Sequence, residues 1–552
     1  MNQISPSVGR KQADGPSVLL INPGFEPKIN ATSRLRQVAR EVPPYFALRL
    51  GAYLQVNNVH VDILDTHIEE DWEAILHRLL SERTYTVIGF TVYLGLLLRN
   101  SKALSKLCRE LSPESTIVWG GPVPSSTPGE ALETYDIDYA VRFEGEETLL
   151  ELVTALADDS DVGEINGLSY IRDGKIIHNP PRLQHKEGLS GFPIPAWNLV
   201  DDYVSREQIP YVASIMGSDG CPYKCNFCYH QASDNPGSPP WRARSVSHIM
   251  EEADMLNEKF GITVFSFADD NFLVRKDRVL EIFEAFRKRD YLIEELNGHY
   301  GNFKEEVIEG MEGLVGRANF SVEAATDKLL KVVNKKIPLD KVPDTVGKLW
   351  DCGVMCATIF IIGLPTEEEE DLRTTFEFMS SLRGRHPQIT ASSCLLQPIP
   401  KTDMVPLMES TCNVKVPIDL KSLEKFCEVP FTEEDFRSIR MFVPHVGEER
   451  FELLKGFQVI FRDIFRSNKL SEEALGLLRD VPKLAKIFEG HEDLPRPKDG
   501  YQHYMLDRVL RGDVTNWKEL LYENAIWPGK EAGKQFSYQL KSEEAAQYEN
   551  TI

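Results

Sequence analysis

The sequence lacks a long hydrophobic run, an apolar leader and any excess of positive charge. No stretch of about 18 apolar residues is present, so we expect no membrane span. Residues 1–16 are polar, without the apolar segment of a signal peptide, and we interpret them as a disordered leader. Aspartate and glutamate number 85 against 62 lysines and arginines, and the net charge of −23 would repel nucleic-acid phosphates. Neither a membrane nor a nucleic acid is therefore an expected partner.

Cysteine is also scarce, at nine residues in 552. Three cysteines lie together, and six are scattered: Cys108, Cys352, Cys356, Cys394, Cys412 and Cys427. This spacing is not that of a disulfide framework, so we expect a protein of the reducing cytoplasm. Cys352 and Cys356 are close enough in sequence to suggest a second metal pair. We interpret them instead as ordinary thiols, since Cys356 opens an apolar strand and free cysteine is commonly buried.

The first part of the chain alternates short apolar strands with helices. With 42% hydrophobic and 27% charged residues, the composition is that of a soluble globular protein of several domains. The expected strands are 18–21, 61–64, 87–90, 116–119 and 139–142. This pattern predicts an α/β domain with a doubly wound, Rossmann-like parallel sheet, which binds ligands beyond the carboxyl ends of its strands. Asn22, Gly120, Gly121 and Glu144 lie at those ends.

From residue 206 the strand–helix rhythm continues on a longer period. The strand candidates are 211–216, 263–267, 295–300, 318–322, 356–362 and 389–395. Six such units predict a partial (βα)6 TIM-type barrel, with its site at the carboxyl ends of the strands. Residues 403–552 are charged, helical in pattern and rich in aromatic residues, and we expect a helical domain that covers the barrel mouth.

A tight group of cysteines follows the first barrel strand. Cys221, Cys225 and Cys228 have the spacing C-x3-C-x2-C. Three thiolates can hold three irons of a cubane [4Fe-4S] cluster, which leaves the fourth iron open for chemistry. Structural zinc is the alternative, but it requires a fourth ligand, and His230 stands at an unusual spacing for one.

This loop resembles the signature of the radical S-adenosylmethionine (radical SAM) enzymes, C-x3-C-x-Φ-C, with Phe227 as the aromatic residue. The resemblance implies that the three cysteines hold a [4Fe-4S] cluster whose open iron binds S-adenosylmethionine (SAM). One electron, from a flavodoxin- or ferredoxin-type donor, then cleaves SAM to methionine and a 5′-deoxyadenosyl radical. In such enzymes Phe227 would pack near the adenine.

Other barrel strand ends carry further candidate contacts to SAM. The resemblance places Glu323 near the methionine or ribose and Gly363 near the adenine. Asp269 is a candidate for the SAM ammonium, and Arg244 for its carboxylate. Each has a plainer interpretation, as a helix cap, a turn residue or a surface ion pair.

The first domain resembles the cobalamin-binding domain that precedes many radical SAM domains. The similarity lies in 20–23, 43–46, 118–122 and 138–147, which makes Asn22, Gly120, Gly121 and Glu144 candidate cobalamin contacts. The family's D-x-H-x-x-G motif, whose histidine binds cobalt, is absent. Asp65-Thr66-His67 looks similar but lacks the glycine, so the lower ligand of cobalt stays open.

Together these features predict a leader (1–16), a cobalamin-binding domain (17–160), a linker with a small hairpin (161–205), a radical SAM barrel (206–402) and a helical domain (403–552). The implied function is a cobalamin-dependent radical SAM methyltransferase. It would methylate an unactivated carbon (or phosphorus) of a small metabolite through the 5′-deoxyadenosyl radical and methylcobalamin. The alternatives are a ring-forming or ring-rearranging enzyme with the same cofactors, and a sensor without turnover. The sequence identifies no catalytic side chain beyond these cofactor contacts.

Overall fold

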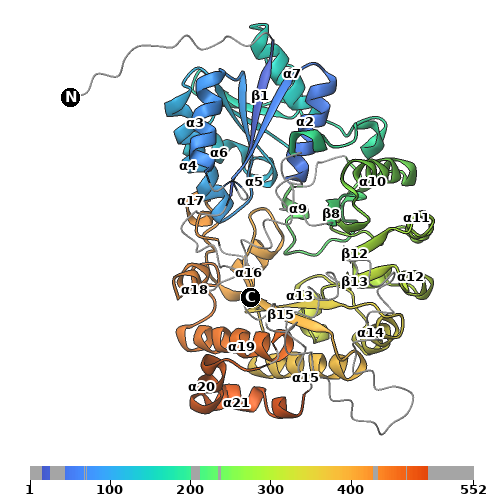
Figure 1. Cartoon of the computed structure of the whole chain (residues 1–552). Helices are drawn as coiled ribbons and strands as arrows, with labels where there is room; N and C mark the ends of the chain where they lie inside the picture. The colour runs from blue at the N-terminus through green and yellow to red at the C-terminus, as the bar shows by residue number, and fades with distance from the viewer. Residues whose placement is uncertain are drawn as a thin grey trace.

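The structure is a computed structural model that describes residues 15–24, 44–66, 69, 71–200, 212–233, 238–426, 433–467 and 469–494 (Figure 1). His67, Cys427, most of the expected leader and the end of the helical domain lie outside the described residues. Among the described helices, none combines the length and apolar character needed to cross a bilayer.

The first domain is built on a seven-stranded sheet in the order β2-β1-β3-β4-β5-β6-β7. Its strands are β1 (Ser17–Asn22), β2 (His60–Asp65), β3 (Val87–Thr91), β4 (Thr116–Gly120), β5 (Tyr139–Val141), β6 (Leu168–Arg172) and β7 (Lys175–His178). β1 to β5 are parallel, which confirms the predicted doubly wound sheet, and β6 and β7 join antiparallel. The hairpin expected within the 161–205 linker is thus an extension of this sheet. β2 lies on one side of β1 and β3 lies on the other, so the strand order reverses at β1. In a doubly wound sheet such a reversal places a ligand-binding crevice between the two strands, here β1 and β3.

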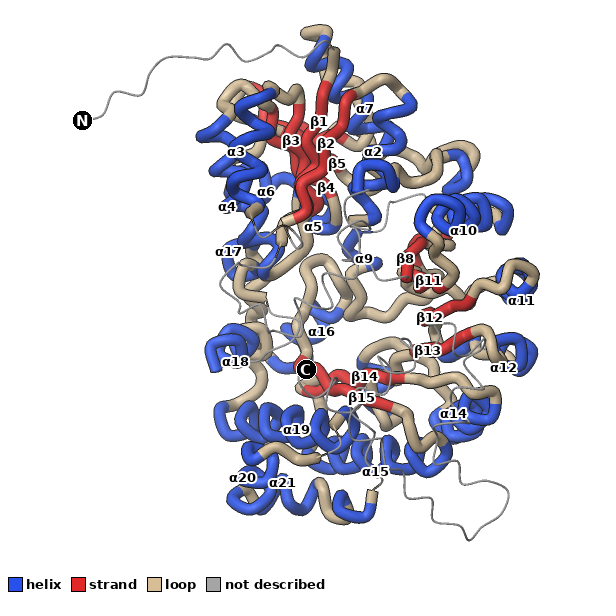
Figure 2. Tube along the Cα trace, viewed as in Figure 1, coloured by secondary structure: helices blue, strands red, loops and turns tan. Residues whose placement is uncertain are grey.

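Helices cover both faces of this sheet (Figures 1 and 2). They are α2 (Tyr45–Val56), α3 (Trp72–Glu82), α4 (Leu96–Leu111), α5 (Pro122–Ser126), α6 (Pro128–Thr134) and α7 (Glu146–Ala157). One core cluster contains buried residues of α3, α4 and α6, and a second contains those of α2 and α7. Leu19 and Leu20 belong to opposite clusters, as expected of neighbouring residues in a strand that is buried on both faces.

The second part forms the predicted partial barrel. Its strands are β8 (Val212–Ile215), β11 (Val264–Phe267), β12 (Leu292–Asn297), β13 (Val315–Asn319), β14 (Ala357–Ile362) and β15 (Thr390–Leu395). The first four form one parallel sheet and the last two another, and isolated bridges join β13 to the β14 side. A short antiparallel pair, β9 (Ser218–Gly220) and β10 (Trp241–Ala243), flanks the cysteine loop.

Two barrel strands differ from their predicted positions. β12 and β13 begin three residues earlier than the expected 295–300 and 318–322. Glu295 lies inside β12 because it stands opposite Arg317 of β13, and their charged groups approach to 3.3 Å. This cross-strand ion pair stabilises the pairing of the two strands.

The barrel helices are α9 (His230–Ser233), α10 (Val246–Phe260), α11 (Lys276–Arg287), α12 (Glu305–Met311), α13 (Asp327–Val332), α14 (Val342–Asp351) and α15 (Glu369–Arg385). After the barrel come α16 (Met404–Cys412), α17 (Leu420–Leu423), α18 (Glu433–Arg440), α19 (Glu448–Arg466), α20 (Glu472–Asp480) and α21 (Pro482–Ile487). α19 packs along β15, where Gln458 donates to the Ser393 carbonyl at 2.9 Å. The C-terminal helices therefore close the side of the barrel and share its core rather than only covering its mouth (Figure 1).

Candidate functional site

The cysteine loop starts at a glycine that no other residue would replace easily. Gly220 has φ +82° and lies opposite Trp241 in the β9–β10 pair, where a Cβ would collide with the Pro240 carbonyl. The chain then turns through Cys221, Cys225 and Cys228 and enters α9. The loop is also held to the end of α13, because the Asn226 side chain donates to the Val332 carbonyl at 2.5 Å.

The three thiols are partly buried and face different surroundings. Burial raises the pKa of Cys225 to about 11 and that of Cys228 to about 12, so metal binding must supply the energy of deprotonation. Asn271 Nδ2 donates to Cys221 Sγ at 3.6 Å. Within the described ranges, no three Cys, His, Asp or Glu side chains converge on one metal ion. Three thiols in one short loop match a cubane, in which each thiolate binds a different iron.

The strand ends around the loop bring together several of the expected residues. Glu323 is buried at φ +67°, and its carboxylate pairs with Lys335 Nζ at 3.0 Å. Its backbone is held by hydrogen bonds to the carbonyl of Ile359 and from the amide of Ile361. Such a strained, over-determined residue is typical of a functional site. Phe227 is partly buried and packs against the barrel core.

Gly363 adopts a left-handed conformation. Its φ is +78°, its amide donates to Glu367 Oε2 at 2.8 Å, and its carbonyl accepts from His445 Nε2 at 3.0 Å. Burial raises the pKa of Glu367 to about 7, while the Gly363 amide and Arg450 oppose that rise. The end of β14 is thus tied to the C-terminal segment that carries His445.

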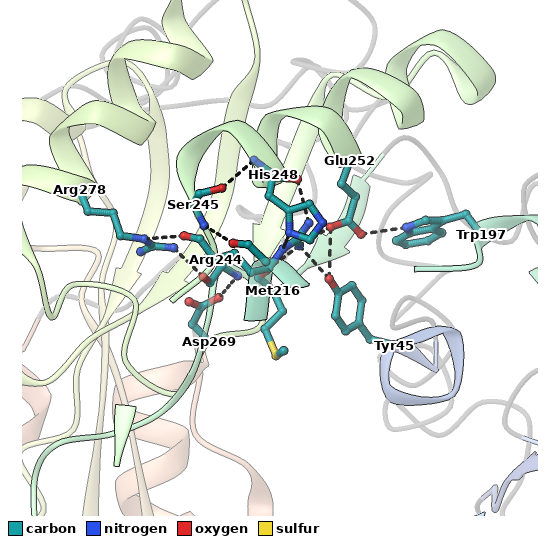
Figure 3. A network of polar contacts seen from close by, with 11 residues as sticks. Tyr45, Trp197, Met216, Arg244, Ser245, His248, Glu252, Asp269 and Arg278 are labelled. Carbon is teal, nitrogen blue, oxygen red and sulfur yellow. Dashed lines mark hydrogen bonds and ion pairs between the residues drawn. The ribbon is translucent and has the colours of Figure 1, made fainter. Parts of the chain in front are cut away.

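Arg244 and Asp269 lie in an internal network instead of in the cavity described below (Figure 3). Arg244 donates to Tyr45 Oη at 3.0 Å, to the Met216 carbonyl at 2.8 Å and to the buried carboxylate of Glu252. Its other donors reach the ring and carbonyl of His248. The structure therefore directs this guanidinium at protein groups of both domains.

Asp269 has a similar supporting place beside that network. Its carboxylate accepts from the Gly217 amide at 2.8 Å and from the Ser218 hydroxyl. Burial raises the pKa of Asp269 to about 6, and these hydrogen bonds oppose the rise. Asp269 thus shapes the turn that leads into the cysteine loop.

A cavity of about 590 Å³ lies between the first domain and the barrel. Four of the expected residues line it: Asn22, Gly120, Gly121 and Glu144. Gly121 has φ +95°, and a Cβ there would stand only 3.1 Å from the Val92 amide nitrogen. The cavity opens at the carboxyl ends of β1, β3 and β4, where a doubly wound sheet binds its ligand. On the opposite side it reaches Tyr229 and His230, directly after the last cysteine of the loop.

Three ion pairs border this cavity, and one of them, between Arg242 and Glu144, joins the two domains. Arg242 of β10 contacts Glu144 at 2.6 Å and Asp219 at 2.7 Å, and Arg49 of α2 contacts Glu146 at 2.6 Å. Burial and neighbouring Glu146 raise the pKa of Glu144, which Arg242 counteracts. Glu144 therefore serves at least partly to hold the two domains together.

Sequence reasoning missed several residues of the site. Arg49 gave no signal, because a single arginine on an amphipathic helix has no motif. Tyr229 and His230 adjoin the cysteine motif, and both approach Asp270, with Tyr229 Oη at 3.0 Å and His230 Nε2 at 3.1 Å. His299 lies just beyond the end of β12, so a search restricted to strand ends would have found it once the strand bounds were correct.

The residues present fit the implied cofactors. The loop offers three thiols, beside a buried acceptor, Asn226 Oδ1, that has no partner among the described residues. For a corrin, the cavity lies at the expected sheet edge and has glycine where the backbone must approach closely.

Comparisons with known proteins agree with this geometry. The family model described as the radical SAM superfamily matches residues 215–379, and the B12 binding domain matches 33–153. An uncharacterized methyltransferase of Pyrococcus horikoshii is 28% identical over 382 residues, which are 68% of this chain and 80% of the relative.

Two further proteins are similar over most of the chain. The anaerobic magnesium-protoporphyrin IX monomethyl ester cyclase of Rubrivivax gelatinosus is 24% identical, covering 70% of this chain and 69% of the cyclase. Among solved structures, the radical SAM methyltransferase TsrM of Kitasatospora setae, with tryptophan and a SAM analogue bound, matches with a TM-score of 0.65. It is 18% identical, and the match covers 90% of this chain and all of TsrM. At that identity, the likeness to TsrM establishes the fold alone.

Proposed function

Because this chain belongs to the cobalamin-binding radical SAM family, with a [4Fe-4S] cluster, SAM and cobalamin as its cofactors, we propose that it is a methyltransferase. Its substrate would be a small metabolite, and the acceptor an unactivated carbon or a phosphorus. When bound, the cluster with SAM supplies a carbon-centred radical, and cobalamin carries the methyl group.

One observation carries this proposal. The cysteine loop and the ligand edge of the first domain border the same cavity, with Tyr229 and His230 on one side and Gly120 and Gly121 on the other. Methyl transfer to a substrate radical requires the two cofactors to share one chamber. The chain's own residues shape that chamber, hold the domains in place through Arg242 and keep bulk water away from a radical. A reducing cytoplasm and a small flavodoxin- or ferredoxin-type electron donor belong to the same proposal.

The test uses the full chain, reconstituted anaerobically with iron, sulfide and cobalamin, and SAM labelled on its methyl group. After reduction of both the cobalamin and the cluster, we expect S-adenosylhomocysteine to form, labelled corrin to appear and 5′-deoxyadenosine to accumulate. A pool of cell metabolites should then yield a labelled small molecule. Absence of label from both corrin and metabolites would rule out the methyltransferase. The matched control replaces Cys221, Cys225 and Cys228 together by alanine.

A cyclase-type reaction is the second candidate, favoured by the similarity to the magnesium-protoporphyrin ester cyclase. It would use the same cavity and the same cluster loop without methyl transfer. In the labelling experiment it gives 5′-deoxyadenosine with no label on corrin or metabolite, so one measurement separates the two reactions.

A further inference from the structure

His299 lies two residues after the end of β12 and is linked to the cysteine loop by one direct contact and by one contact through Asn271. Its ring stacks on Tyr223, with 3.5 Å between centroids and 11° between planes. Tyr223 stands between Cys221 and Cys225 in the loop. The His299 amide donates to Asn271 Oδ1 at 3.1 Å, and the same Asn271 side chain donates to Cys221 Sγ. Both the backbone and the ring of His299 are therefore positioned relative to the loop.

The tautomer of this imidazole follows from its one ring hydrogen bond. The Gly301 amide donates to Nδ1 at 3.1 Å, so Nδ1 carries the lone pair and Nε2 carries the hydrogen. Burial, reinforced by the Lys335 charge, lowers the pKa of His299 to about 3, which keeps the ring neutral. In the described part of the chain, buried Nε2 has no hydrogen-bond partner. Leaving such a buried donor unpaired destabilises the protein, and a bound acceptor removes that cost.

The surroundings of this donor favour an anionic partner. Lys335 is 8% exposed, and its ammonium contacts Glu323 at 3.0 Å and the Ser321 carbonyl at 2.6 Å. The positive charge of Lys335 acts on both the His299 ring and the Cys225 thiol, so the three groups are electrostatic neighbours. An acceptor held at the cysteine loop would thus meet an N–H dipole close to an ammonium that already pairs with Glu323.

We propose that His299 Nε2–H donates a hydrogen bond to an anionic acceptor bound at the cysteine loop. The acceptor is a sulfur of the [4Fe-4S] cluster or the carboxylate of SAM, which share this chemistry. His299 is then a positioning residue that tunes the cluster or orients SAM. The inference rests on the cofactor assignment and is independent of whether a methyl group is transferred.

Two substitutions separate the donor from the other role of the ring. His299→Gln places an amide N–H near the position of Nε2 and keeps the donor. His299→Asn places its oxygen near Nδ1, keeping the acceptor for Gly301 but losing the donor. If the donor matters, the Gln variant resembles the parent protein and the Asn variant is impaired. The reverse order would show that the ring only caps the local turn, and would overturn the proposal.

Both variants are examined as the reconstituted full chain in two arms. The first measures the reduction potential of the cluster without SAM, and the second measures the dissociation constant of SAM. If a cluster sulfur is the acceptor, the potential of the Asn variant becomes more negative, since hydrogen bonds to sulfur favour the reduced state. If the SAM carboxylate is the acceptor, SAM affinity falls about tenfold or more at unchanged potential, as expected for a hydrogen bond to a charged group.

The control is His386→Asn, a buried histidine that bonds the Val354 carbonyl near the amino end of β14. The His386→Asn substitution should change neither the reduction potential of the cluster nor the dissociation constant of SAM. An Asn variant at 299 that loads its cluster and matches the parent in both arms would overturn the proposal. If it cannot hold the cluster while the Gln variant does, that contrast itself supports a donor to the cluster.

Discussion

The joint between the two domains and the surroundings of the cysteine loop both contain buried polar side chains, but they differ in how these side chains are hydrogen-bonded. At the joint, Glu252 is completely buried, and its carboxylate accepts from Trp197 Nε1 at 2.9 Å, from Tyr45 Oη at 3.2 Å and from Arg244 (Figure 3). Beside the loop, by contrast, His299 Nε2 and Asn226 Oδ1 are buried without partners among the described residues.

The contrast distinguishes architecture from binding. A buried charge that is fully hydrogen-bonded fixes two elements relative to one another, while a buried polar atom without a partner stores a cost that a ligand can relieve. Substitutions at the joint should therefore reduce stability, and substitutions at the loop should reduce cofactor binding.

The largest expected effect comes from the loop. Replacing Cys221, Cys225 or Cys228 singly by serine should abolish the brown absorbance of the cluster and all formation of 5′-deoxyadenosine, because each thiolate holds one iron. Absorption spectra after anaerobic reconstitution test this. Cys352→Ser, outside the loop, is the control and should keep the cluster. Full cluster absorbance and turnover in all three loop variants would contradict the assignment.

At the joint, Glu252→Ala should destabilise the protein by about 3–5 kcal/mol, because it leaves the Arg244 guanidinium buried and uncompensated. Urea unfolding of the cofactor-free chain measures the loss. Glu251→Ala, at the exposed neighbouring position on α10, should have almost no effect. Equal stability of the two variants would show that the network does not hold the domains.

Gly121 and Gly174 allow the effect of the cavity on cobalamin binding to be separated from a general effect on stability. Gly121→Ala should lower stability by about 1–2 kcal/mol through its positive φ, and should also weaken cobalamin binding because Gly121 lines the cavity. Gly174→Ala has a similar φ of +72° but open space around it and lies in the β6–β7 turn. Equilibrium binding of cobalamin should therefore separate the two variants. If both bind cobalamin equally, Gly121 does not contact the corrin.

The smallest effect is a pH dependence at the joint. Burial and Arg244 lower the pKa of His248 to about 4, so between about pH 4 and pH 6.5 the unfolded chain binds more protons than the folded one. This histidine thus contributes stability above pH 6.5 that is lost as the pH falls toward 4. In His248→Gln that contribution is absent, and melting temperatures across this range should show a shallower decline. If melting temperatures of the His248→Gln variant show the same pH dependence as those of the parent protein, His248 does not contribute to it.

Much of this organisation follows from the sequence, because it depends on local patterns. The cysteine spacing, the apolar strands and the glycines at their ends predict both folds and the general place of the cavity. The roles of Arg244 and Asp269 were not predictable. Their actual partners, such as Tyr45 and Gly217, lie far away in the chain or are backbone groups that carry no sequence signal.

One error of register had a specific cost. Expecting β12 at 295–300 places His299 inside a strand, where a histidine attracts no attention. The strand instead runs from Leu292 to Asn297, three residues earlier than expected. Only then does His299 fall at the carboxyl end of a barrel strand, the position at which functional residues are expected.

The indole of Trp197 is an intrinsic fluorescent probe of the contact between the two domains. It is 2% exposed and bonded to the carboxylate on which both halves of the molecule meet. When the halves part, water reaches the ring and its fluorescence moves to longer wavelength, so the emission lost in a Trp197→Phe variant reports separation in real time. Separation of the two parts during unfolding can thus be followed without attaching a label.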